Sequence, residues 1–327
     1  MGANTSASTS ASLCTPLQLH SRCTVACLIP EEEEQQRERE QEPAAPQLRV
    51  AALRRYPVKS GQAENLAAAA ITPTGLLGDR RFAVVSTGGR CLTQRENPKL
   101  ATLGASLTSD GQMLHLSMGP AALNVSVRSD GEVIAAQLFS EGLPLRDQGR
   151  DASRWLSRHL DEGSLLPLIG LPSLRLLFAP PDTPRRAGLS DVAPVHLICE
   201  ITLAALNARR VEQGLPPAPM DRFRPNIVLS GCSAPHIEDG WQRLQIGRLS
   251  FTVDGPCPRC TVPDVEQKTG ARDQSSVGPM QTLRGYRARA GAGVLFGIYL
   301  TPFGVTGVGD EVRVGDEVRV VAASASL

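Results

Sequence analysis

The sequence predicts an α+β fold in which a β-rich, barrel-like N-terminal domain precedes a second domain of mixed strands and helices. Three observations lead to this prediction. After residue 46, short runs of alternating apolar and polar residues follow one another closely, as in antiparallel sheets and barrels. Apolar residues at helical spacing occur at 151–160 and 200–207, between strand-like runs. A loop rich in Pro and Arg at 179–186 marks a domain seam near residues 165–185.

The first 46 residues differ from the rest of the chain. Residues 3–12 are nearly all small or polar, and residues 31–46 are a run of Glu, Gln and Arg that ends in prolines. Such a composition cannot bury enough apolar surface to offset the entropy lost on ordering, so a disordered tail is predicted over 1–46. The opening Met1-Gly-Ala-Asn-Thr-Ser6 fits the N-myristoylation pattern and predicts weak, acyl-dependent membrane association.

Length and composition set limits on function. With 327 residues and 41% hydrophobic content, the chain can hold two ordinary domains with sizeable cores. A net charge of +1 and 4% aromatic residues disfavour binding to nucleic-acid polymers, which needs basic surfaces and stacking rings. The eight cysteines are spread along the chain without a disulfide framework, so we expect a reducing compartment. No apolar run reaches 18 residues, so no membrane-spanning helix is predicted.

The N-terminal domain is predicted over 47–170. Its strands are short runs bounded by turn residues, expected at 49–54, within 71–85, and at 113–117, 123–127 and 132–135. A helix is predicted at 151–160 because its apolar residues recur at helical spacing after an acidic start. A further strand at 174–178 leads into the seam.

The second domain is predicted over 171–327. Strands are expected at 194–198 and 222–231, a helix at 200–207, and a hairpin at 243–253. Near the C-terminus the hexapeptide Gly-Asp-Glu-Val-Arg-Val occurs twice in succession, at 309–314 and 315–320. This duplication predicts a lengthened hairpin or a shifted terminal strand, with no chemistry of its own.

Two cysteines three positions apart, Cys257 and Cys260, are the strongest single sign of a functional site. The strand-like run 249–254 leads into a predicted Gly-Pro turn and then this pair. The pair is compatible with a thioredoxin-like dithiol, with a zinc site, or with one thiolate ligand to a soft metal carried by a cofactor. Pro263 and a polar stretch follow where a dithiol site needs an amphipathic helix. The five histidines are scattered singly, which disfavours zinc.

Seven segments occur in an order that resembles a known family. They are Tyr56-Pro-Val-Lys-Ser60, Gly78-Asp-Arg-Arg-Phe82, Leu189-Ser-Asp191, Phe223-Arg-Pro-Asn-Ile227, Glu238-Asp-Gly-Trp241, Cys257-Pro-Arg-Cys260 and Leu295-Phe-Gly-Ile-Tyr299. Together they resemble the MOSC proteins with an N-terminal β-barrel domain, and in particular the amidoxime reducing component of eukaryotes. The resemblance covers about residues 47–321. It implies that the second domain is a MOSC domain with a mixed β-barrel core and flanking helices.

The resemblance also implies a molybdenum cofactor, Mo-molybdopterin. In the family the second cysteine of the pair ligates molybdenum, which gives Cys260 that role here, and a soft thiolate suits a metal held by a pterin dithiolene. Asp191 is implied as a further catalytic residue that accepts hydrogen bonds from the pterin. The implied cofactor-binding residues are Lys59, Ser60, Arg81, Asp191, Val192, Ala193, Arg224, Cys257, Pro258, Arg259 and Tyr299.

Physical reasons accompany several of these assignments. Lys59 and Ser60 follow a strand at a turn, where an ammonium, a hydroxyl and a backbone N–H can converge on the cofactor's phosphate. Arg81 and Arg224 carry planar guanidinium groups suited to bidentate anion binding. Arg80, in contrast, is interpreted as a surface partner of acidic residues. The segment at 94–96 resembles the family but has no role that the residues themselves predict.

The function implied by the resemblance is the reduction of N-hydroxylated compounds, including amidoximes, N-hydroxyguanidines and N-hydroxylated nucleobases. Because no C-x4-C-x2-C iron–sulfur run occurs, electrons are expected from an external donor. The resemblance implies that this donor is cytochrome b5 with an NADH-dependent cytochrome b5 reductase. Arg185, Arg186 and Arg259 are expected to form a basic rim that faces the acidic donor. The alternative is a non-catalytic carrier of molybdenum cofactor or sulfur. Because residues 1–46 hold no hydrophobic signal-anchor, a cytoplasmic location is expected rather than the mitochondrial outer membrane.

Overall fold

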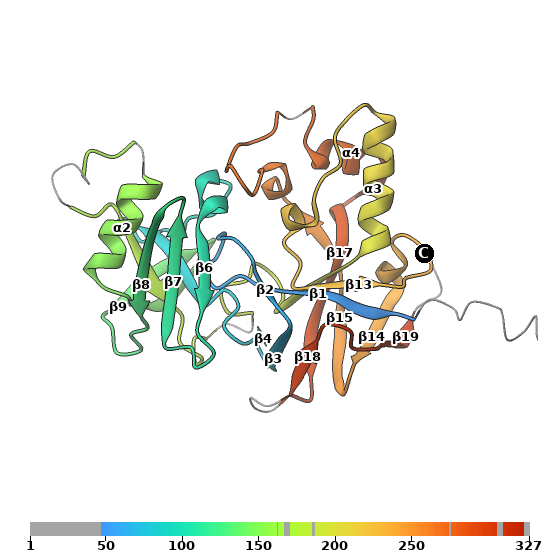
Figure 1. Cartoon of the computed structure of the whole chain (residues 1–327), viewed down its shortest axis with the longest axis horizontal. Helices are drawn as coiled ribbons and strands as arrows, with labels where there is room; N and C mark the ends of the chain where they lie inside the picture. The colour runs from blue at the N-terminus through green and yellow to red at the C-terminus, as the bar shows by residue number, and fades with distance from the viewer. Residues whose placement is uncertain are drawn as a thin grey trace, which may run out of the picture. The chain divides into compact units, whose positions relative to one another are not determined.

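The computed structural model describes residues 47–161, 163–166, 171–184, 187–274, 276–305 and 310–323. The predicted tail, 1–46, lies outside this part of the chain. Residues from Pro46 onward form one compact unit. Figure 1 shows that this unit is rich in strands, which form several sheets, and that its described residues also form three α-helices, α2, α3 and α4. The predicted α+β class is confirmed. No described helix is both long and apolar enough to span a bilayer.

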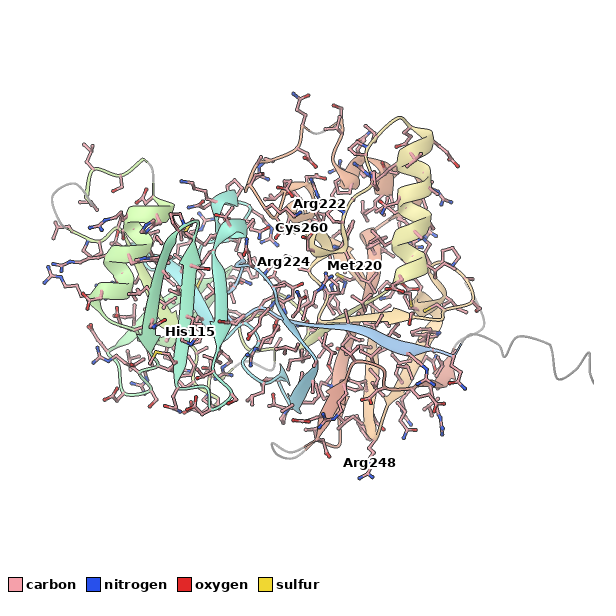
Figure 2. The ribbon with its side chains drawn as sticks, in the orientation of Figure 1. His115, Met220, Arg222, Arg224, Arg248 and Cys260 are labelled. Atoms are coloured by element: carbon pink, nitrogen blue, oxygen red, sulfur yellow. The ribbon has the colours of Figure 1, made fainter. Side chains whose placement is uncertain are left out.

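Small antiparallel sheets dominate the N-terminal part. Their strand orders are β5-β11-β10-β9, β6-β7-β8 and β18-β3-β4. Figure 2 labels His115 on β7, whose Nδ1 lies 2.7 Å from Oδ1 of Asn124, its cross-strand partner on β8. The strands are β3 (Ala68–Thr72), β4 (Gly75–Leu76), β5 (Phe82–Ser86), β6 (Gly104–Leu107), β7 (Met113–Met118), β8 (Ala121–Ser126), β9 (Val133–Leu138), β10 (Glu141–Asp147), β11 (Leu174–Phe178) and β18 (Glu311–Arg313).

The largest sheet is mixed and joins the two ends of the chain. Its order is β19-β14-β15-β17-β12-β13-β1-β2, with β16 paired to β17. β12 and β13 run parallel, whereas β1 pairs antiparallel with β13. The N-terminal strand therefore completes a sheet whose other strands, apart from the short β2, come from beyond residue 194. The strands are β1 (Arg49–Arg55), β2 (Glu64–Leu66), β12 (Val195–Cys199), β13 (Ile227–Ser230), β14 (Trp241–Ile246), β15 (Leu249–Arg259), β16 (Ala288–Arg289), β17 (Gly293–Phe303) and β19 (Val318–Ala323).

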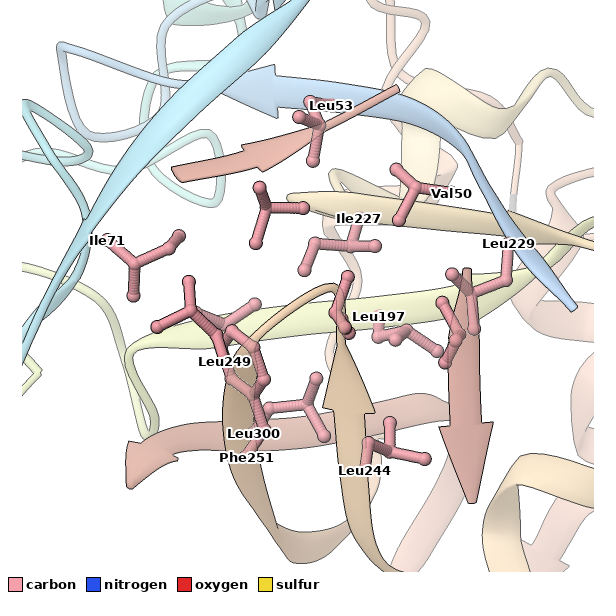
Figure 3. Close-up of a cluster of buried hydrophobic side chains, with 14 of the residues drawn as sticks. Val50, Leu53, Ile71, Leu197, Ile227, Leu229, Leu244, Leu249, Phe251 and Leu300 are labelled. Carbon is pink, nitrogen blue, oxygen red and sulfur yellow. The ribbon is translucent and has the colours of Figure 1, made fainter. Parts of the chain in front are cut away.

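Apolar side chains from this sheet form one core. Leu53 on β1 lies opposite Ile227 on β13, and both are buried. Figure 3 shows that Leu197, Phe251 and Leu300 point into the same cluster. Each fully buried side chain of this size contributes about 1.5–3 kcal/mol to folding. The strand pairing of distant segments is thus held by packing as well as by hydrogen bonds.

The described parts of the two hexapeptide copies enter different sheets. Val312 on β18 pairs with β3, and Val318 on β19 pairs with β14. Both valines are buried in the core of the large sheet. The predicted lengthening of one hairpin is wrong, because the duplication supplies two separate short strands that each bury the same valine of the repeat.

The helices bury one face each. α2 (Arg150–Leu160) packs Ala152, Leu156 and Leu160 against the N-terminal sheets, as its spacing predicts. α3 (Glu200–Glu212) and α4 (Pro279–Arg287) share a smaller cluster that also includes Phe223 and Phe296. Four 3-10 helices complete the described elements: η1 (Pro98–Thr102), η3 (Met220–Phe223), η4 (Ile237–Gly240) and η5 (Val262–Asp264).

Asp264 explains why α4 begins where it does. A carboxylate oxygen of Asp264 accepts the backbone N–H of Met280 at 3.0 Å, which satisfies a donor that a helix start leaves unpaired. Pro279 at the first position has no N–H to satisfy. The cap comes from 16 residues upstream, so the sequence next to α4 does not reveal it.

His236 precedes η4 in the left-handed region, with φ 62°. Within the described residues neither of its ring nitrogens has a hydrogen-bond partner. Burial, together with Arg287 and Arg209, lowers the pKa of His236 to about 4. The imidazole therefore stays neutral in the folded protein at pH values where it is protonated in the unfolded chain.

We expect this histidine to make the fold less stable as pH falls from about 6.5 to 4. In this window the unfolded chain binds a proton that the folded state excludes, which favours unfolding. For a partly exposed ring the expected contribution is about 1–2 kcal/mol after allowance for solvent screening. His236→Asn, which tolerates the same backbone conformation, should lose less stability in urea unfolding measured at pH 7 and pH 4.5. Identical pH dependence in the two proteins would contradict this assignment.

Candidate functional site

A cavity of about 420 Å³ is lined by residues from both the N-terminal and the C-terminal part of the compact unit. In Figure 2, Cys260 and Arg224 lie near one another, and both line this cavity. Ten of the residues predicted for the site contribute to its wall, whereas Arg81 and Cys257 do not. The ten are Lys59, Ser60, Asp191, Val192, Ala193, Arg224, Pro258, Arg259, Cys260 and Tyr299.

The cavity is strongly basic. Among the described residues, its lining carries five cationic side chains against one carboxylate, that of Asp191; the cations belong to Lys59, Arg80, Arg95, Arg224 and Arg259. Two guanidinium nitrogens, Nη2 of Arg224 and Nε of Arg259, are buried without a hydrogen-bond partner among the described residues. Because unpaired buried donors cost about 1–3 kcal/mol each, such groups normally find a partner. The charge excess and the unpaired donors together fit an anionic ligand.

Asp191 is held by two of these cations. Lys59 forms an ion pair with Asp191 and also donates from Nζ to the carbonyl oxygen of Leu189 at 2.8 Å. Nη2 of Arg95 lies 3.0 Å from the other carboxylate oxygen. Burial raises the pKa of Asp191, but Lys59 and then Arg95 outweigh it and lower the pKa to about 2. Asp191 is therefore ionised at neutral pH and acts only as a hydrogen-bond acceptor.

Arg224 ends η3 in the left-handed region, with φ 56°. Its guanidinium lies 4.3 Å from the ring centroid of Tyr56, and its Nη1 donates to the carbonyl oxygen of Gly61 at 2.6 Å. A second contact, 3.4 Å long, is to the neutral amide oxygen of Gln267. Burial lowers the pKa of Arg224 to about 10, so the group stays charged at neutral pH. These neutral acceptors leave its charge for an incoming anion.

The two adjacent arginines take places opposite to those predicted. Arg80, expected at the surface, lines the cavity; it pairs with Asp79 and donates from Nη1 to Oδ1 of Asn226 at 3.1 Å. Arg81 lies outside the cavity, with its guanidinium 5.5 Å from the ring of Phe178. Arg80 has a left-handed backbone conformation, with φ 46°, and the two side chains lie in different surroundings. Arg80 therefore occupies the place expected for Arg81.

The cysteine pair lies on a strand rather than after a turn. β15 continues through Gly255 and Cys257 to Arg259 and pairs with β17 along its length, so the predicted turn is absent. The register shifts twice, once before Gly255 and once before Pro258. Such bulges redirect side chains. Cys260 follows the strand and lines the cavity, whereas Cys257 is buried behind it.

Cys257 is the centre of a hydrogen-bonded group behind the cavity wall. Its sulfur accepts from Nη1 of Arg259 at 3.1 Å and is hydrogen-bonded to Tyr299. Arg259 also donates to the carbonyl oxygen of Phe223 at 2.9 Å and lies 3.3 Å from Nε2 of His196. Burial, reinforced by Cys257, raises the pKa of Tyr299, so this phenol stays neutral. Cys257 thus positions two wall residues and does not face a ligand itself.

Arg95 and His196 are site residues that the sequence does not predict. Arg95 is hydrogen-bonded to both Cys260 and Asp191; burial lowers the pKa of Arg95, but these two partners raise it overall. His196 lies on β12, where burial and then Arg259 lower its pKa well below the usual value. A polar residue in an otherwise apolar, fully buried strand is the signal that could have identified His196. The segment around Arg95 resembles the family but predicts no role for it, because the partners of Arg95 are distant in sequence.

Unusual backbone conformations are concentrated at this cavity. Five non-glycine residues in the described part of the chain have positive φ, and four of them line the cavity: Ser60 (65°), Arg80 (46°), Phe139 (56°) and Arg224 (56°). Side chains disfavour this region for steric reasons. Such strain persists where the surrounding structure enforces it, and it gathers at binding sites. The backbone therefore identifies the same site as the side-chain charges do.

The donor set fits a metal that arrives within a cofactor. No group of three His, Cys, Asp or Glu side chains within the described residues is arranged to hold a metal ion. A metal bound by Cys260 would draw its other ligands from the cofactor, and the cationic lining would receive that cofactor's phosphate.

Comparison with protein-family models matches two successive domains of the chain. Residues 47–163 match the MOSC N-terminal beta barrel domain, and residues 184–319 match the MOSC domain. The chain is 30% identical over 282 residues to mitochondrial amidoxime reducing component 2 of Rattus norvegicus, which covers 80% of each protein. It is 31% identical over 253 residues to mitochondrial amidoxime-reducing component 1 of Homo sapiens, covering 73% of this chain and 72% of the relative. It is 29% identical over 269 residues to molybdenum cofactor sulfurase of Oryza sativa subsp. japonica, covering 75% of this chain but 31% of that protein.

Proposed function

Since the chain belongs to the amidoxime reducing component family of MOSC-domain proteins, we propose that it reduces N-hydroxylated compounds at a molybdenum cofactor held in the basic cavity. The proposed substrates are amidoximes, N-hydroxyguanidines and N-hydroxylated nucleobases. The observation that carries the proposal is the placement of Cys260 in this cavity beside Arg95 and the ionised Asp191. One soft ligand, several cations and one fixed acceptor match the parts of a phosphorylated metal–pterin.

Each of these residues has a proposed task. Cys260 would ligate the metal, Arg80 and Arg224 would bind the phosphate, and Asp191 would accept N–H groups of the pterin. When bound, the molybdenum centre supplies the two-electron exchange that removes oxygen from the N–O bond. Reduction of an N–O bond to N–H and water also consumes two protons. Asp191, with a pKa of about 2, holds no proton to give at neutral pH, so these protons are expected to come from solvent.

Cytochrome b5 and its NADH-dependent reductase are the proposed electron donors, on the basis of the family. Of the three arginines expected to form the basic rim that binds these donors, only Arg259 belongs to the described residues. Arg185 and Arg186 lie outside the described residues. Arg259 directs its hydrogen bonds inward to Phe223 and Cys257, so it serves the cavity wall rather than a docking surface.

A non-catalytic cofactor or sulfur carrier is the second candidate, and the similarity to molybdenum cofactor sulfurase favours it. One experiment separates the two. Purified protein would be analysed for molybdenum and pterin, and benzamidoxime reduction would be measured with cytochrome b5, its reductase and NADH. We expect bound cofactor and NADH-dependent reduction. Bound cofactor without reduction, also with a chemical reductant, would support the carrier instead.

Removal of residues 1–46 should leave the turnover per bound molybdenum nearly unchanged. The described residues that line the cavity all come from position 59 onward, and the composition of the tail does not suit cofactor binding. The measurement compares molybdenum content and benzamidoxime reduction for the full chain and a chain that starts at residue 47. Loss of cofactor in the shorter protein would show that the tail contributes to the site.

A further inference from the structure

Phe139 occupies a place in the cavity wall that its own backbone disfavours. It is the first residue of a two-residue turn between β9 and β10, in which Leu138 pairs with Glu141. Its φ is 56°. A hairpin turn with positive φ at this position strongly favours glycine, because a Cβ atom is crowded there. A large aromatic residue in this conformation is an outlier that calls for an explanation.

Packing of Phe139 into a core does not provide that explanation. The residue is 52% exposed. Two cations instead lie near the ring: Nζ of Lys59 is 5.6 Å and Cζ of Arg95 is 5.5 Å from its centroid. These are cation–π distances. The same two cations bind Asp191, and Arg95 also bonds Cys260. The exposed ring is therefore fixed within the charged group that surrounds the proposed metal ligand.

Phe139 also contributes to the walls of two cavities. Together with Thr93 it lines both the basic cavity and a second cavity of about 290 Å³, whose wall includes Arg90, Glu96 and Gln137. A flat ligand on the ring could thus place one end near Cys260 and the other in the second cavity.

We propose that Phe139 forms an aryl-binding subsite that selects planar aromatic substrates. The aromatic part of an N-hydroxylated compound stacks on the exposed ring, its N–O group enters the basic cavity, and larger substituents occupy the second cavity. This inference rests on the proposed function and narrows its substrate class to aromatic over small aliphatic compounds. A ring that is already held in one orientation loses little conformational entropy when a ligand stacks on it. This entropic advantage gives a reason for a strained phenylalanine at a position where glycine would fit.

The test compares benzamidoxime with acetamidoxime on cofactor-loaded wild-type protein and on Phe139→Ala, Phe139→Gly and Phe139→Trp. Dissociation constants come from calorimetry, and kcat/KM from steady-state reduction. We expect Phe139→Ala to lower the aromatic-over-aliphatic preference about three- to tenfold in both quantities, equivalent to about 0.6–1.4 kcal/mol. Phe139→Trp should keep the preference, and all variants should keep their molybdenum. Phe139→Gly should lose the preference yet melt no lower than Phe139→Ala, because glycine adopts this turn without strain.

Several results would overturn the subsite. They are an unchanged preference in Phe139→Ala, an equal loss for both ligands, or no binding of either ligand to the wild-type protein. A rate loss seen with cytochrome b5 but not with dithionite would assign Phe139 to donor docking, and so would also overturn it. If the wild-type protein binds with the expected preference, and Phe139→Ala loses it, but no reduction occurs, the subsite stands and the proposed function fails.

Discussion

Replacing Cys260 with Ala should abolish the reduction of amidoximes while leaving the fold intact. Cys260 is the proposed metal ligand, it is only partly buried, and it belongs to none of the apolar core clusters. The decrease in activity should exceed the roughly 10- to 100-fold effects that follow mutation of residues around metal ligands. The measurements are the rate per chain, the molybdenum content and the urea unfolding curve, which should match that of the wild-type protein.

Cys257→Ser is the matched control for this change. Serine keeps a polar atom that can accept from Arg259 and bond Tyr299, so the wall behind the cavity should be preserved. We expect a substantial fraction of the wild-type activity, and Cys257→Ala should also retain activity. If both cysteine positions proved equally essential, a dithiol mechanism would regain support over a single thiolate ligand.

Arg224→Ala should lower the molybdenum content far more than it changes the turnover of each bound molybdenum. The guanidinium is the proposed phosphate anchor, and its hydrogen-bond partners among the described residues are neutral oxygens of Gly61 and Gln267. A charge-assisted contact of this kind is worth about 1.5–3 kcal/mol. This corresponds to about ten- to a hundredfold in cofactor affinity. Molybdenum per chain and rate per molybdenum would be measured side by side.

Arg81→Ala provides the comparison, because the sequence predicts an anion-binding role for both arginines and the structure places only Arg224 at the cavity. Arg81→Ala should keep its molybdenum. Arg224 also packs on Tyr56, so its removal could lower cofactor content by destabilising the fold. The melting temperature of each cofactor-free variant would reveal such destabilisation. Full molybdenum occupancy in a stable Arg224→Ala protein would refute the anchor.

The sequence predicts local elements well where one segment contains its own signal. The strand at 174–178 and the helix at 151–160 have apolar spacing that needs no distant partner, and the structure has β11 and α2 there. α4 is missed, because its N-terminal cap is Asp264, a residue outside the helix. A cap supplied by tertiary contact leaves no pattern at the helix itself.

The same distinction explains the site. Motifs such as Tyr56–Ser60 and Cys257–Cys260 could be recognised one at a time, and most of their residues do reach the cavity. The exchange of places between Arg80 and Arg81 accompanies a left-handed φ angle at Arg80, and a non-glycine residue gives no sequence signal for that conformation. Phe139 is hidden for the same reason. Its turn lacks the glycine that would mark it.

The pairing of β1 with β13 has a consequence for how the protein is made. The first strand leaves the ribosome more than 170 residues before its partner. At 5–20 residues per second, the interval is roughly 10–35 s. During that time β1 can pair only with the short β2, so its other edge stays unpaired, and an unpaired strand edge invites aggregation. The nascent chain must therefore keep β1 from aggregating until β13 has been synthesised. A C-terminal half synthesised alone would expose the unpaired edge of β13 to neighbouring chains.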